Sequence, residues 1–107
     1  MVEKGHNEME IFEIISHGGG ARSLSYEALT AAEEGDFKKA EEIMQKAEEE
    51  MLEAHHTQTR LIQDELNDKP VEKSLLMIHA QDHLMTAIAE KNLIERMITL
   101  YKRLEAK

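Results

Sequence analysis

The chain has 107 residues, enough for one domain with one modest core, and it contains no cysteine. The lack of cysteine excludes disulfides, thiolate metal sites and a cysteine nucleophile, and it fits a cytosolic protein. A net charge of −9 opposes nucleic-acid binding, which needs a basic surface. No apolar run approaches the roughly 20 residues of a membrane span, and Met1 to Glu10 lack the regions of a signal peptide. We therefore expect one cytoplasmic domain over residues 1–107.

The first two predicted helices meet at a glycine. Ala, Glu, Lys, Leu, Met and Ile dominate the sequence, which is a helical composition. The first helix is expected over about residues 8–34, with Gly35 just beyond its C-terminus. Asp36 suits the N-cap of a second helix that runs to about Leu66. The acidic run at residues 48–50 is most simply a solvated face of that helix.

The third predicted helix follows a short loop. Residues 67–70, Asn-Asp-Lys-Pro, end the second helix, because proline disfavours a helical residue before it. The third helix is expected to begin between Val71 and Ser74 and to end near Leu104. Short connections make successive helices antiparallel, so the sequence predicts an all-α, up-down-up three-helix bundle.

Three successive glycines, Gly18 to Gly20, interrupt the apolar stripe of the first helix. In a helix interior they cost about 2–3 kcal/mol in summed propensity. Either the helix kinks there, or another backbone comes close enough to exclude side chains. A phosphate-binding glycine loop is the alternative, but no strand precedes the run and no Lys-Ser/Thr follows it.

The third helix carries two neighbouring apolar faces, whereas a surface helix normally shows one. The first face comprises Leu75, His79, Asp82, Thr86, Ala89, Leu93, Met97, Leu100 and Leu104. The second comprises Leu76, Ala80, His83, Leu84, Ala87, Ile94, Ile98 and Tyr101. A second apolar face needs a second partner, so we expect a homo-oligomer in which this helix packs against its own copies.

Asp82 lies in the middle of the first apolar face. A lone buried carboxylate is costly unless it is protonated, paired or bound to a cation. If the third helix lines a symmetry axis, the copies of Asp82 converge there and repel. A shared hard divalent cation such as Mg²⁺ would relieve that repulsion.

The string from His79 to Thr86, His-Ala-Gln-Asp-His-Leu-Met-Thr, resembles the IIA component of the lactose/cellobiose-type sugar phosphotransferase system. Further similarity lies in Ala21-Arg22-Ser23-Leu24, Tyr26-Glu27-Ala28-Leu29, Glu34-Gly35-Asp36-Phe37, Glu53-Ala54-His55 and Gln58-Thr59. The resemblance implies a homotrimeric nine-helix bundle. It implies that His79 is the phosphorylated histidine, and that Asp82 meets its two copies around a metal ion, Mg²⁺ being the expected one.

The resemblance also implies a phosphoryl relay. A histidine phosphocarrier protein would donate to His79, and His79 would pass the group to a cysteine of the IIB component. The IIC membrane permease would then deliver a disaccharide of the cellobiose, lactose or chitobiose class. Neutral imidazole suits this role, because it is a nucleophile near pH 7. Gln81 could orient a phosphate oxygen, and His83 could either contact the phosphoryl group or serve helix packing.

Two other hypotheses remain from the residues alone. The chain could be a helical interaction protein in which a buried polar layer sets the register. Alternatively, His79, Asp82 and His83 could bind Zn²⁺ or iron from a single helix, with Glu90 nearby. Metal content distinguishes the hypotheses, since the relay predicts about one Mg-type ion per three chains.

Overall fold

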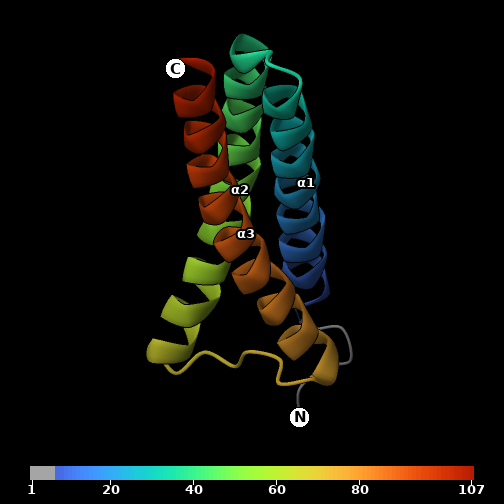
Figure 1. Cartoon of the computed structure of the whole chain (residues 1–107). Coiled ribbons are helices and arrows are strands. Elements are labelled where there is room, and N and C mark those ends of the chain that lie inside the picture. The colour runs from blue at the N-terminus through green and yellow to red at the C-terminus, as the bar shows by residue number, and fades with distance from the viewer. Residues whose placement is uncertain (1–6) are drawn as a thin grey trace.

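The computed structural model describes residues 7–107, which form α1 (Glu8–Glu33), α2 (Phe37–Leu66) and α3 (Leu75–Glu105). The helices run up, down and up in a rod of 62 × 20 × 19 Å (Figure 1). The all-α, up-down-up three-helix bundle predicted from the sequence is therefore confirmed. Each helix begins and ends within one residue of the predicted limit.

Local chemistry sets where each helix begins. Gly35 has a positive φ of 83°, a conformation that glycine adopts without steric cost. Asp36 then caps α2, because its carboxylate accepts a hydrogen bond from the backbone N–H of Lys39 at 3.2 Å. Ser74 caps α3 in the same way through Met77, at 3.1 Å, so α3 begins just after the predicted interval. The cap at Asp36 and the glycine junction are as predicted.

The core depends on small residues. α1 packs against both other helices along its length, whereas α2 and α3 meet only in part. In Figure 1, α2 and α3 separate toward the end where residues 67–74 connect them. Alanines in the interior allow the helices to approach closely. The fully buried alanines are Ala21, Ala28, Ala40, Ala47, Ala54, Ala80 and Ala87.

A polar contact ties the start of α1 to the start of α3. The side-chain oxygen of buried Asn7 accepts from the backbone N–H of Glu72 at 2.6 Å. The Glu72 carboxylate in turn accepts from the hydroxyl of Ser74 at 2.6 Å, and Ser74 is the α3 cap. These bonds fix the beginning of α3 against α1, one turn before His79.

The two predicted faces of α3 differ in burial. The second face supplies the core, where Ala80, Leu84, Ala87, Ile94 and Ile98 are buried. The first face is exposed along its whole length, from Leu75 through Asp82 to Leu104. α3 therefore does carry a spare apolar face, as the sequence predicted. Within residues 7–107, no helix is long and apolar enough to cross a membrane.

Candidate functional site

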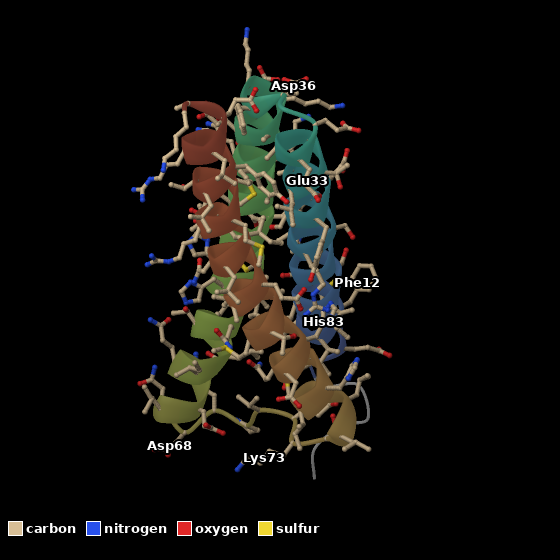
Figure 2. The ribbon with its side chains drawn as sticks, in the orientation of Figure 1. Phe12, Glu33, Asp36, Asp68, Lys73 and His83 are labelled. Atoms are coloured by element: carbon tan, nitrogen blue, oxygen red, sulfur yellow. The ribbon has the colours of Figure 1, made fainter. Side chains whose placement is uncertain are left out.

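His79 and His83 lie one turn apart on α3, with their imidazole rings stacked. The ring centroids are 6.2 Å apart and the interplanar angle is 19°. His79 is exposed, and within residues 7–107 its ring has no hydrogen-bond or ion-pair partner. His83 is half-buried where α3 passes α1 (Figure 2). The two histidines thus differ in access and in surroundings.

The glycine run of α1 provides the space for His83. A Cβ atom on Gly19 would lie 3.2 Å from Nε2 of His83, which is tighter than an ordinary contact. A Cβ on Gly18 would lie 3.7–3.8 Å from side-chain and backbone atoms of Leu84 and from the His83 ring. α1 continues without interruption through these glycines. The prediction of a close neighbour is correct, but at Gly19 that neighbour is the His83 side chain and not a backbone, since the nearest backbone atom, Cα of Leu84, lies 3.8 Å from a Cβ on Gly18, an ordinary contact distance.

Arg22 on α1 makes several polar contacts with α3 around His83. Its Nη1 lies 3.2 Å from Nδ1 of His83, and its Nη2 donates to the His83 carbonyl at 3.1 Å. Nη2 also donates to the hydroxyl of Thr86. Nε lies 3.3 Å from the Glu90 carboxylate, which is ion-pair distance, although its N–H is not aimed for a hydrogen bond. All three guanidinium nitrogens thus have partners on α3.

Glu90 is itself held from α1. The hydroxyl of Tyr26 donates to its carboxylate at 2.6 Å, and this bond raises the pKa of Tyr26 above its ordinary value. Tyr26 and Arg22 lie one turn apart on α1, so both reach the same carboxylate. Glu90 therefore connects two α1 side chains and keeps the Arg22 guanidinium in place.

The hydrogen bonds of His83 determine its tautomer. Guanidinium is donor-only, so Nδ1 of His83 must be the unprotonated acceptor and the ring proton must be on Nε2. The backbone carbonyl of Ile15 also interacts with the ring as an acceptor. Burial first, then the charges of Arg22 and His79, lower the pKa of His83 below its usual value. His83 is consequently neutral at pH 7.

Gln81 and Asp82, the other polar residues of the stretch, have different surroundings. Gln81 accepts a hydrogen bond from the Gln58 amide of α2 at 2.6 Å. Asp82 is exposed, and its carboxylate has no partner in the described part of the chain. Both residues line an open, largely apolar groove between the end of α2 and the start of α3. Gln81 is therefore engaged within the chain, while Asp82 is available to another molecule.

The metal-site hypothesis fails within one chain. His79, Asp82 and His83 do not converge, and no group of three metal-binding side chains exists among residues 7–107. Asp82 and His79 are both on the exposed face of α3, whereas His83 lies against α1. The phosphate-loop alternative fails too, because the glycines lie inside a helix. What remains at the site is one accessible imidazole beside a second one that is fully engaged.

Comparison with known proteins shows the family to which the chain belongs. Residues 9–102 match the family described as the lactose/cellobiose-specific IIA subunit of the PTS system. The chain belongs to this family. It is 48% identical over 101 residues to the lichenan-specific phosphotransferase enzyme IIA component of Bacillus subtilis, with 92% of both chains covered. The resemblance seen in the sequence is therefore confirmed.

Solved structures of the same family share the fold. The cellobiose-specific enzyme IIA of Bacillus anthracis superposes with a TM-score of 0.91 at 48% identity, covering 100% of this chain and 96% of that one. The chitobiose IIA of Escherichia coli, solved in complex with HPr, gives a TM-score of 0.79 at 38% identity, covering 92% and 95%. The chain is thus a IIA component of the lactose, cellobiose and chitobiose type.

The sequence had not assigned the contacts of Arg22, Tyr26 and Glu90. Arg22 and Tyr26 had been noted only as parts of matching strings, and Glu90 only as a residue near the possible metal ligands His79, Asp82 and His83. The spacing of Arg22 and Tyr26, four residues apart and next to a glycine run, is the available signal. It does not reveal the partner, because Glu90 lies 64 residues after Tyr26.

Proposed function

We propose that this IIA chain relays a phosphoryl group through His79 during sugar uptake. The observation that carries the proposal is the contrast within the histidine pair. The His79 ring is exposed and has no polar partner within residues 7–107, whereas the His83 ring is held on both sides. An acceptor must present a free nitrogen lone pair to phosphorus, and His79 meets that condition.

The transfer needs positioning more than chemical activation. An unprotonated nitrogen of His79 attacks phosphorus, the new P–N bond forms, and the P–N bond of the donor phosphohistidine breaks. Phosphoryl transfer has a largely metaphosphate-like transition state, so catalysis depends mainly on alignment and electrostatics. Neutral imidazole needs no general base for this step. In the second transfer, a thiolate attacks the phosphoryl group and His79 is released unchanged.

The partners follow from the family. The donor is the histidine phosphocarrier protein, with which the chitobiose relative was solved in complex. The acceptor is a cysteine of the IIB component, and the IIC permease imports the sugar. We infer that the relay operates in the cytoplasm. The sugar belongs to the cellobiose, lactose or chitobiose class, and lichenan oligosaccharides fit the same class given the Bacillus subtilis relative.

The exposed face of α3 supports a homotrimer, that is, a nine-helix bundle. Contiguous exposed apolar surface marks an interaction site. Large exposed apolar side chains follow this face and its edge along the helix: Leu75, Ile78, Met85, Leu93, Met97, Leu100 and Leu104. An apolar hollow lined by Leu29, Met97, Leu100, Tyr101 and Leu104 continues this stripe toward α1. Three copies of α3 packed along one axis would cover it.

Asp82 fits a shared cation in such a trimer. Its carboxylate is exposed, unpaired within the described chain, and surrounded along α3 by apolar side chains. One chain offers one carboxylate there, so the site requires copies. A divalent ion, with Mg²⁺ as the proposed one, would neutralise the converging carboxylates of Asp82 and hold the helices together.

The relay is tested by following phosphorylation of the chain and the later loss of that phosphate to IIB. The chain is incubated with phosphoenolpyruvate, enzyme I and the histidine phosphocarrier protein, and its intact mass is recorded at mildly alkaline pH. The proposal predicts one acid-labile phosphate per chain, absent when the carrier is omitted and lost when IIB is added. A IIB variant lacking its cysteine should not discharge it. A folded chain that takes no phosphate from an active carrier overturns the proposal.

A further inference from the structure

We propose that Arg22 and the glycine run of α1 mask His83 as a phosphoryl acceptor, so that Arg22 is the positioning residue that confines the phosphoryl group to His79. The inference rests on the proposed relay for its functional meaning. Its structural part, a His83 ring whose two nitrogens are both blocked by α1, can be measured without any transfer.

His79 and His83 are similar enough that both could accept the phosphoryl group. They lie on the same helix, one turn apart, with stacked rings 6.2 Å between centroids. A donor phosphohistidine that reaches His79 also comes near His83. Neutral imidazole is nucleophilic at either position. Selection between the two must therefore come from the access to each ring nitrogen.

Nδ1 of His83 is blocked by Arg22. The guanidinium Nη1 lies 3.2 Å from this nitrogen and donates into its lone pair, which is the pair that would attack phosphorus. Arg22 cannot easily turn away, since it also binds the His83 carbonyl, Thr86 and Glu90. Tyr26 holds Glu90 from the same side. The block is thus a fixed part of the α1–α3 contact.

Nε2 of His83 is blocked twice. It carries the proton, because Nδ1 must accept from the donor-only guanidinium. It also faces α1 at Gly19, where even a methyl group would lie only 3.2 Å away. A phosphoryl group is much larger than a methyl group, so it has no room there. His79 has neither restriction, and it remains the accessible acceptor of the pair.

The same contacts argue against direct binding of the phosphoryl group by Arg22. Each of its three nitrogens already has a partner on α3. The guanidinium lies between α1 and α3 with its side chain largely covered. Arg22 thus acts through His83, and its removal should redirect the phosphoryl group rather than simply prevent its binding.

The first test is the tautomer of His83 in the unmodified chain, read by long-range ¹H–¹⁵N NMR at one fixed neutral pH. The inference predicts the Nε2–H form with Nδ1 unprotonated and hydrogen-bonded to Arg22. In Arg22→Met the ¹⁵N shift of Nδ1 should change, while the Ile15 carbonyl still accepts from Nε2–H. Ser23→Ala, a change at the exposed neighbour of Arg22, is the matched control and should keep the wild-type shift. An Nδ1–H form in the wild type, or an unchanged Nδ1 shift in Arg22→Met, would show that Arg22 does not block Nδ1.

The second test follows the phosphate in a His79→Gln background, with peptide mapping at alkaline pH. His79→Gln alone should remain unphosphorylated. Adding Arg22→Met should let Nδ1 of His83 attack phosphorus as the donor P–N bond breaks. Phosphate at His83 should rise by about tenfold or more, the factor that one charge-assisted hydrogen bond is worth. A further His83→Gln change should remove it.

The outcomes separate the two proposals. If wild-type protein takes no phosphate, the relay proposal is wrong. The NMR measurement on His83 still tests whether Arg22 blocks Nδ1. If His79 is charged but His83 stays unphosphorylated in folded His79→Gln/Arg22→Met, masking is not what protects His83 and the inference is wrong. Phosphate on His83 in His79→Gln with Arg22 intact also overturns it.

Discussion

His79 and His83 have stacked rings 6.2 Å apart, yet within residues 7–107 only His83 is held by polar partners from another helix. Two histidines one helical turn apart therefore have different roles: one packs between helices and the other is exposed. His83 belongs to the contact between α1 and α3, where it fills the space left by the glycine run. His79 extends beyond that contact to the surface. The predictions below test each part of this arrangement.

The glycine run predicts a difference between two neighbouring substitutions. Gly20→Ala should stabilise the protein by about 0.5–1 kcal/mol, because alanine favours the helix and the new methyl group meets only the flexible carboxylate of Glu50, 3.6 Å away. Gly19→Ala gains the same propensity but crowds His83 at 3.2 Å. It should be less stable than Gly20→Ala by about 1 kcal/mol or more.

Urea unfolding of the two alanine variants checks this difference at one protein concentration. Each variant serves as the control for the other, because both change one helical glycine to alanine on adjacent positions of α1. Equal stabilisation by the two substitutions would show that His83 does not need the space at Gly19.

Asp82 predicts a metal-dependent assembly. The wild-type protein should lose part of its trimer population when EDTA removes divalent ions, because uncompensated carboxylates repel. Asp82→Leu should assemble independently of EDTA, because no carboxylates then converge at the axis and no cation is needed to neutralise them. Glu49→Leu, at an exposed acidic position of α2, is the control and should keep the wild-type response.

Sedimentation velocity with and without EDTA measures this effect. Bound metal in the wild-type protein should correspond to about one ion per three chains, the stoichiometry of a site on a threefold axis. A trimer that is equally stable with EDTA, for both wild-type and Asp82→Leu protein, would contradict the role given to Asp82.

Lys91 predicts a pH-dependent contribution to stability. It is only 5% exposed and bridges Glu48 of α2 to Glu95 of α3. Burial is the largest single influence and lowers the pKa of Lys91, but the two carboxylates together outweigh burial and raise it above 10.5. A raised lysine pKa means that the folded state binds the proton more tightly. The contribution is thus complete below pH 10.5 and is lost as the pH rises through the folded-state pKa.

Lys91→Met should therefore lower the free energy of unfolding by about 1 kcal/mol at pH 7. The difference from wild type should shrink when both proteins are compared above pH 10.5. Lys46→Met, at an exposed position of α2, is the control and should have little effect at either pH. A Lys91→Met difference that does not change with pH would show that packing of the aliphatic stem, not the charge, is responsible.

Much of the fold could be predicted because its signals are local. Gly35 and Asp36 define the junction between α1 and α2. Gly35 does so through its backbone conformation, and Asp36 through a hydrogen bond to a residue three positions later. The helix limits follow from such caps and from the proline at residue 70. The spare face of α3 could also be predicted, since the periodicity of apolar residues reveals two faces where a monomer needs one.

The contacts between helices could not be predicted in the same way. Arg22 and His83 are 61 residues apart, and nothing in their local sequences names the partner. The acidic run on α2 shows the same limit. We predicted a solvated face, but Glu48 pairs with Lys91 and Glu50 lies 2.5 Å from His17. Glu48 and Glu49 are exposed, as predicted, and Glu50 is half-buried. The ion-pair partners could not be predicted, because a charge that has a distant partner looks the same in sequence as one that has none.

The most direct test of the account is which histidine carries the phosphate. Wild-type, His79→Gln and His83→Gln proteins are charged in parallel through the histidine phosphocarrier protein, and the phosphate is counted by intact mass spectrometry at mildly alkaline pH. We predict one acid-labile phosphate on wild-type and His83→Gln protein and none on His79→Gln. A phosphate that persists in folded His79→Gln and disappears in His83→Gln would contradict the assignment of His79.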